Sequence, residues 1–220
     1  MSRSTVWLTH NRVRLALHCL RGGEGRPLLL LHGLGEQSPH AVPPWAEPWC
    51  GPVWALDFTG HGESEIPLGG GYSAEILLAD ADHALAHLGT ATVVGRGLGA
   101  YIALMLGGAR AAQVTGTVLL DGPGLFGGAT GPTSNSFVVL PQATTTPDPY
   151  ALHELSKDLR PRDYATLFVR LALEHSGLPT HVSPVTVDAV VRPPWLTAVV
   201  GEVGTVEQSV DEALALYAQF

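Results

Sequence analysis

The sequence predicts an α/β domain with a mostly parallel sheet and helices on both faces. Short aliphatic and β-branched runs, such as residues 28–31 and 114–120, are typical of strands buried on both faces. From residue 28 onward these runs alternate with helix-like segments, which is the pattern of a parallel sheet. Glycines cluster directly after residues 92–94, where a strand must turn sharply into a helix.

Composition limits the classes of protein that fit. The chain has 220 residues, so we expect one domain over residues 1–220, and its 45% hydrophobic content supports a sizeable core. The net charge of −8 argues against nucleic acid and anionic membranes as partners. Cys19 and Cys50 form no close-spaced metal or redox pattern, so no metal site is expected. We also expect no cofactor. No signal peptide or membrane-spanning run is evident, and we expect a soluble, cytoplasmic protein.

The first elements follow from alternation and capping signals. Alternating apolar and polar residues over 5–8 and 13–20 predict an antiparallel N-terminal hairpin. Ser73 is a candidate cap for a helix over 74–88. At most a short helix fits among the prolines of residues 39–48. The other elements predicted up to residue 120 are strands over 28–31, 53–58 and 114–120, and a helix from the glycine turn to about residue 112.

The second half of the chain is predicted to begin with an insert. Residues 122–149 are rich in Gly, Pro, Ser and Thr, which indicates a long loop or lid, and helical periodicity follows to residue 175. We interpret about 122–192 as a small cap or lid insert. Residues 196–200 are predicted to form the last strand, and Thr205 to Gln208 resemble a capping box for a C-terminal helix.

The glycine turn admits two interpretations. Gly95, Gly97 and Ala100 fit the dinucleotide fingerprint, and Asp121 lies about 20 residues further on, where an acid binds the ribose. Gly95, Gly97 and Gly99 fit the nucleophile elbow, with glycine in place of its serine. The fingerprint normally opens the first βαβ unit of a domain, whereas a hairpin and two strand–loop units come first here. The elbow is therefore favoured, and dinucleotide binding is the less favoured alternative.

Three motifs in order resemble the α/β-hydrolase family. His32-Gly33 follows a buried strand, Asp57-x-x-Gly60-His61-Gly62-x-Ser64 follows the next, and the glycine elbow follows the third. The resemblance covers residues 5–121 well, and residues 195–202 resemble that family's penultimate strand. It implies an α/β-hydrolase-type sheet with its final strand missing and a small cap insert after the matched part.

The resemblance also implies that the catalytic triad is lacking. The family's nucleophile position falls on Gly97, which has no side chain. The acid would follow the penultimate strand near Gly204, where Glu202 is the only carboxylate close by. The catalytic histidine would follow a final strand that is not evident. Because covalent acyl transfer needs all three groups within hydrogen-bond reach, we expect a degenerate member with no catalytic residue.

Backbone donors can survive the loss of side chains. By the resemblance, the oxyanion hole would be formed by the N–H groups of Leu98, which follows the nucleophile position, and Leu34, in the His-Gly loop. Leu98 also opens a helix, which favours an anion there. The further pocket candidates are His32, Gly33, Arg96 and Asp121. Arg96 could pair with an anionic ligand or with Asp121, or point to solvent.

The favoured function is a non-hydrolytic pseudoenzyme that binds a small ligand with a carbonyl or anionic group, or a partner, in the ancestral pocket. One alternative is an active hydrolase that uses relocated residues, for example a cap histidine with Ser64. Another is an interaction role, in which the shortened sheet edge joins copies into a homo-oligomer.

Overall fold

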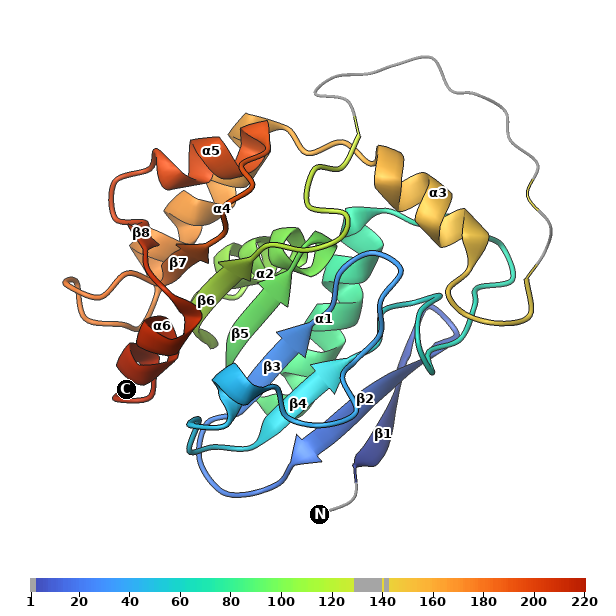
Figure 1. Ribbon diagram of the computed structural model, residues 1–220, viewed down its shortest axis with the longest axis horizontal. Helices are drawn as coiled ribbons and strands as arrows, with labels where there is room; N and C mark the ends of the chain where they lie inside the picture. Colours follow the sequence, from blue (N-terminus) through green and yellow to red (C-terminus); the bar gives the residue numbers. More distant parts are fainter. Residues whose placement is uncertain (1–2, 129–139, 141–142) are drawn as a thin grey trace.

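The computed structural model describes residues 3–128, 140 and 143–220 (Figure 1). One eight-stranded sheet has the order β1-β2-β4-β3-β5-β6-β7-β8. β1 (Ser4–His10) and β2 (Val13–Arg21) form the predicted hairpin, and β2 pairs antiparallel with β4 (Val53–Leu56). All remaining pairs are parallel. The predicted α/β class, a mostly parallel sheet with an N-terminal hairpin, is confirmed.

The other strands lie on either side of a short central strand. β3 (Leu28–Leu31) pairs with β4 on one side and with β5 on the other, and all four of its residues are buried. The run of four leucines suits this position because both of its faces are covered by helices. The strands beyond it are β5 (Ala91–Arg96), β6 (Val114–Leu120), β7 (Val185–Asp188) and β8 (Val206–Glu207).

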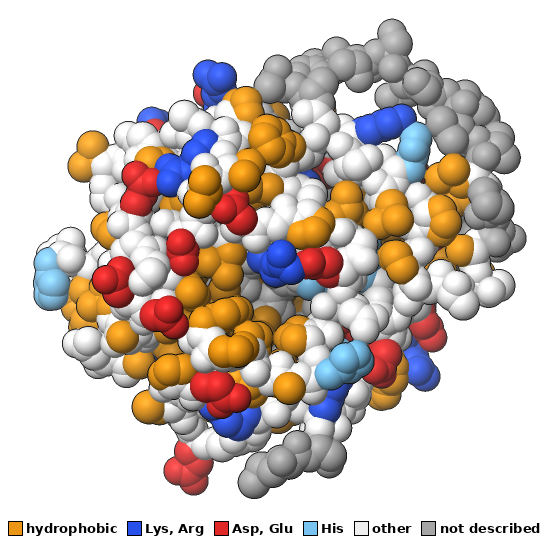
Figure 2. All heavy atoms as spheres, viewed as in Figure 1, with side chains coloured by type: hydrophobic (Ala, Val, Ile, Leu, Met, Phe, Trp, Pro, Cys, Tyr) orange, Lys and Arg blue, Asp and Glu red, His pale blue; other side chains and the backbone are white. Residues whose placement is uncertain are grey.

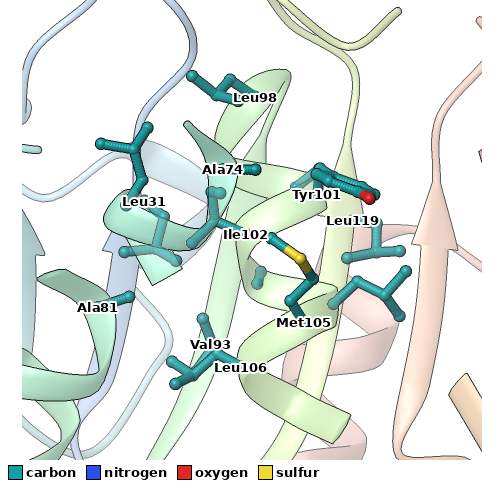
Figure 3. Close-up of a cluster of buried hydrophobic side chains, with 14 of the residues drawn as sticks. Leu31, Ala74, Ala81, Val93, Leu98, Tyr101, Ile102, Met105, Leu106 and Leu119 are labelled. Atoms are coloured by element: carbon teal, nitrogen blue, oxygen red, sulfur yellow. The ribbon is translucent and has the colours of Figure 1, made fainter. Parts of the chain in front are cut away.

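Helices cover both faces of the sheet, as the sequence predicts; Figure 1 shows α1 and α2 behind it and α6 in front. The residues of β3 alternate between two cores: Leu29 and Leu31 pack with α1, α2, α4 and α5, whereas Leu28 and Leu30 pack with α6 and η1. Figure 3 shows the core behind the sheet. The helices are α1 (Ala74–Leu88), α2 (Leu98–Ala109), α3 (Pro149–Lys157), α4 (Arg162–His175), α5 (Pro194–Val200), α6 (Val210–Tyr217) and the 3₁₀ turn η1 (Pro44–Ala46).

The predicted last strand over residues 196–200 is wrong, because these residues belong to helix α5. Pro194 lies in the first turn of α5, where its missing N–H is not needed and its fixed φ suits a helix. A short apolar run does not reveal by periodicity alone whether it is a strand or a buried helix. The penultimate strand is β7, which lies within residues 122–192, the range predicted as an insert.

The end of the chain also differs from the prediction. Residues 206–207 are not part of a capping box but form β8, which pairs with Thr186 and Val187 of β7. The capping box is formed by Ser209 and Glu212, at the start of α6. The final strand, which the sequence indicates as missing, is therefore present and shortened to two residues.

The extent of a cap stays a prediction. Within the predicted insert, α4 packs on α2: a Cβ at Gly108 would overlap with the backbone of Phe168. α3 is tied to the segment before α1, since the Tyr72 hydroxyl donates to Asp148 at 2.6 Å and the Tyr72 N–H donates to Glu154 at 2.6 Å. These bonds place α3 beside the first turn of α1.

Candidate functional site

The glycine turn between β5 and α2 has the geometry of an elbow. β5 ends at Arg96 and α2 begins at Leu98, so Gly97 alone reverses the chain, with φ +59° and ψ −121°. A side chain is strained at this left-handed φ, and glycine is not. A Cβ on Gly95 would overlap with the backbone of Gly99, and a Cβ on Gly99 would overlap with that of Leu31. The spaced glycines therefore let helix and strand backbones pack directly against each other.

The space over Gly97 is filled by the segment that follows β6. The carbonyl oxygen of Pro123 accepts hydrogen bonds from the N–H groups of Leu98 at 2.9 Å and Leu34 at 3.0 Å. A Cβ on Gly97 would overlap with the same oxygen. The two donors predicted for an oxyanion hole thus converge on one oxygen, at distances typical of such a hole. That oxygen belongs to the chain itself.

Two side chains hold this segment in place. Arg160 is 3% exposed, and its guanidinium donates to the carbonyl oxygens of Gly124 and, at 2.6 Å, Leu125. The Trp195 indole N–H also donates to Leu125 O, at 2.8 Å. Burial lowers the pKa of Arg160 to about 10, which still leaves the guanidinium charged at neutral pH. Pro123 is therefore fixed on both sides, by the two backbone donors and by Arg160 with Trp195.

His32 lies beside this site but is fully engaged. Its Nδ1–H donates to Gly33 O at 2.8 Å, and its Nε2 accepts from the Phe58 N–H at 3.2 Å. Burial, with the nearby His61, lowers the pKa of His32 to about 4. The imidazole is therefore neutral near pH 7 and has no free nitrogen for catalysis. The N–H of Gly33, another candidate, donates to Glu36 at 3.0 Å.

The two charged candidates are not brought together. Arg96 forms an ion pair with Glu36, which the sequence analysis did not single out. Asp121 accepts from the N–H groups of Val190 at 2.6 Å and Val191 at 3.1 Å, and so holds the loop after β7. Among the described residues, Arg96 makes no hydrogen bond or ion pair with Asp121, which was one of the pairings considered for it.

The corrected strand order moves the triad's acid position. Asp188 ends β7, and its carboxylate accepts from the Val210 N–H at the start of α6, at 2.8 Å. Glu202, the carboxylate considered from the sequence, instead forms an exposed ion pair with Arg170 at 2.9 Å. Between β8 and α6 the chain reads Gln208-Ser209, with no histidine. A carboxylate is thus present at the acid position, but the connection between β8 and α6 supplies no base beside it.

A hydroxyl, an imidazole and a carboxylate line up at a different place. Thr5 Oγ1 lies 2.9 Å from His18 Nδ1, and His18 Nε2 lies 3.0 Å from Asp57 Oδ2. This row of three side chains is not evident from the sequence, because the residues come from β1, from β2 and from the loop that directly follows β4. The Arg3 guanidinium lies 2.6 Å from the same Nε2 atom and competes for it.

Asp57 also has a structural role, apart from its contact with His18. It accepts from the N–H groups of Ser38 at 2.6 Å and Glu63 at 2.7 Å. The hydrogen bonds from His18 and from these N–H groups outweigh burial and hold the pKa of Asp57 well below its usual range. Asp57 therefore ties together the loops that follow β3 and β4.

Neither a metal-ligand cluster nor a membrane-spanning helix is found in the part of the chain that the structure describes. There, no group of three or more His, Cys, Asp or Glu side chains is arranged to hold a metal ion. No helix of residues 3–128, 140 and 143–220 has the length and apolarity to cross a bilayer.

The strand order, the elbow and the two converging backbone donors together define a protein with hydrolase architecture. The chain belongs to the alpha/beta hydrolase family, whose sequence profile matches residues 28–219. Among curated proteins the comparison finds no match.

Solved structures resemble the chain over its whole length. A thioesterase domain from the curacin biosynthetic pathway aligns with a TM-score of 0.60 and 17% identity, covering 100% of this chain and 99% of that one. A membrane phospholipase A, described as a bacterial virulence factor, aligns with a TM-score of 0.56 and 16% identity, covering 99% and 85%. At these identities the likeness shows the fold alone.

Proposed function

We propose that the chain is a non-hydrolytic member of its family, a pseudoenzyme that binds a small ligand or a partner. The carbonyl oxygen of Pro123 carries the proposal: it occupies both Leu34 and Leu98 donors and the space in which a residue-97 side chain would stand. A hydrolase needs that space for its nucleophile and for the substrate's carbonyl group. Gly97 offers no nucleophile, and no histidine stands between β8 and α6.

A ligand in the ancestral pocket would have to replace Pro123. Its carbonyl or anionic oxygen would take over the hydrogen bonds of Leu34 and Leu98, at the N-terminus of α2. Binding there is therefore coupled to release of residues 122–125 from Arg160 and Trp195.

Ester hydrolysis and active-site labelling test the proposal. The purified chain is incubated with short-chain p-nitrophenyl esters and with a fluorophosphonate probe, and the heat-unfolded chain sets the background. We expect neither turnover nor labelling above that background. Turnover that disappears when one serine or threonine is replaced would overturn the proposal.

The second candidate, a hydrolase with relocated residues, is favoured by the Thr5–His18–Asp57 chain. Thr5 would be the nucleophile, His18 the base and Asp57 the orienting acid. Thr5→Val removes the hydroxyl at nearly constant shape, and Thr9→Val on the same strand is the matched control. Probe labelling that is lost only in Thr5→Val would select this candidate.

Two further roles stay predictions. Dinucleotide binding is less supported, since both carboxylate oxygens of Asp121 accept backbone N–H groups and the Leu98 N–H is occupied. Self-association through a sheet edge would use β1 or the two-residue β8. Gel filtration against the predicted mass tests it.

A further inference from the structure

A cavity of about 530 Å³ lies beside the glycine turn, on the face of the sheet that carries η1 and α6. Figure 2 views this face, and a hollow opens near its middle beside one basic and one acidic side chain. Its floor is formed by Leu30, Val94 and Leu120, from the neighbouring strands β3, β5 and β6. Neither Gly97 nor the donors Leu34 and Leu98 line it. The cavity is therefore separate from the occupied elbow, although it shares His32 and Arg96 with the predicted ancestral pocket. Its volume is typical of small-molecule sites, roughly 300–1,000 Å³.

The cavity exists because the connection between β3 and β4 forms almost no helix. Prolines at 39, 43, 44 and 48 limit it to the three-residue turn η1. That turn covers only part of this face, and Pro39, Pro43 and Trp45 form the wall opposite the sheet. With aliphatic side chains below and proline and indole rings above, the cavity suits an apolar ligand body.

One end of the cavity is polar and carries two charged side chains, Glu36 and Arg96. The hydrogen-bonding capacity of Glu36 is taken up more fully than that of Arg96. Both Glu36 oxygens are engaged, one by Arg96 and the other by the Gly33 N–H. The Arg96 guanidinium uses a single nitrogen for Glu36, while its side chain is 48% exposed and carries five N–H donors in all. Donors for an anion therefore remain on Arg96.

Ser38 supplies a second polar group at this end. Ser38 is 2% exposed and lines the cavity, and its hydroxyl makes no well-formed hydrogen bond with the described residues, although it lies close enough to Asp57 to help lower the pKa of that carboxyl. A buried polar group without a partner is costly, and a ligand oxygen would supply the missing bond. The only other titratable group of the lining, His32, is neutral and already bonded through both nitrogens, so it neither repels nor attracts an anion.

We propose that this cavity binds a medium-chain aliphatic carboxylate, with the chain on the apolar floor and the carboxylate on Arg96 and Ser38. The inference rests on the proposed binding function and names its ligand class and site. The inference is tested by ligand binding and not by turnover. Absence of binding would therefore leave the non-hydrolytic assignment standing, and detection of turnover would leave the binding result standing.

The test titrates decanoate into the full chain below its micelle concentration, by calorimetry and by tryptophan fluorescence, since Trp45 lines the cavity. We expect saturable binding of one decanoate per chain. Arg96→Gln should weaken it about tenfold or more, as expected for loss of a charge-assisted hydrogen bond. Glu36→Gln should strengthen it, because the negative charge that pairs with Arg96 and repels a ligand carboxylate is removed. Arg162→Gln, at an exposed arginine on α4, is the matched control and should change nothing.

Decanol, which lacks the carboxylate, and a variant that fills the cavity separate the contributions of the carboxylate and of the aliphatic chain. Decanol should bind equally to the native chain and to Arg96→Gln, and Val94→Trp should abolish both ligands by filling the floor. Circular dichroism verifies the fold of each variant. The proposal is overturned if decanoate does not saturate, if Arg96→Gln and Arg162→Gln behave alike, or if a folded Val94→Trp binds as the native chain does.

Discussion

The carbonyl oxygen of Pro123 lies 2.9 Å from the amide nitrogen of Leu98, the first residue of α2. This bond joins the segment after β6 to the turn after β5, and the Leu34 N–H completes a pair of donors on the same oxygen. The partial positive charge at the start of α2 is thus met by a neutral dipole of the chain itself.

Gly97→Ser should restore no esterase activity and should destabilise the fold. The new Cβ would overlap with Pro123 O, and the left-handed φ of +59° adds backbone strain, so we expect a loss of about 2 kcal/mol or more in the free energy of unfolding. Urea unfolding and the p-nitrophenyl ester assay measure the two effects.

The matched control for that variant is Gly201→Ser. Gly201 has φ −73°, and the nearest atom to an added Cβ is Ala198 O at 3.4 Å. This variant should unfold at nearly the native urea concentration. Robust hydrolysis by Gly97→Ser, or equal stability of the two variants, would contradict the prediction.

Arg160→Gln should loosen the segment that carries Pro123. The variant loses bonds to Gly124 and Leu125, so the amides of Leu34 and Leu98 should exchange with solvent several-fold faster. Hydrogen exchange read by mass spectrometry measures this. The exposed Arg162→Gln serves as the control, and equal exchange in both variants would show that Arg160 does not hold the segment.

Burial of His32 should make the protein acid-sensitive. Its folded pKa of about 4 lies below the ordinary value of 6.5, so between these pH values the unfolded chain binds more protons. Stability should fall as the pH drops through this window, by up to about 3 kcal/mol from this group. His32→Asn should flatten the dependence measured by urea unfolding, whereas the exposed His87→Asn should leave it unchanged. If the free energy of unfolding of His32→Asn depended on pH as steeply as that of the native chain, His32 would not be the source of the acid sensitivity.

Tyr72→Phe should weaken the attachment of α3. Burial and the neighbouring Asp148 raise the pKa of the Tyr72 hydroxyl well above its usual range, so it stays protonated and donates at 2.6 Å. Its removal leaves a buried carboxylate with one donor fewer, which costs about 1–3 kcal/mol. Thermal unfolding measures the loss. Tyr164→Phe, on α4, is the control, and a Tyr72 variant as stable as this one would count against the bond.

Local patterns predict the first half of the fold well. The hairpin follows from alternation, and α1 follows from Ser73, whose side chain accepts from the Ile76 N–H as expected of a cap. The region after residue 180 is predicted poorly because its signals are short. β7 has four residues, and the apolar run after Pro194 fits strand and helix equally until its packing partners are known.

In the candidate site, too, some features can be predicted from the sequence and others cannot. The spaced glycines predict a sharp turn from strand to helix, and the family resemblance implies backbone donors at Leu34 and Leu98. Their use by a ligand stays a prediction. Pro123 was missed because its place depends on where a loop settles in three dimensions. A proline between two glycines directly after a buried strand is the signal that could have raised the question.

The overlap between a Cβ at position 97 and Pro123 O constrains the order of evolutionary change. A serine that arises at this position meets the connection after β6 before it meets any substrate. Under the proposed non-hydrolytic function, ester chemistry at this elbow would also require residues 122–125 to be rerouted, a change that by itself confers no catalytic benefit. Because Pro123 occupies the elbow, a single substitution at position 97 would not be enough to restore a catalytic serine there.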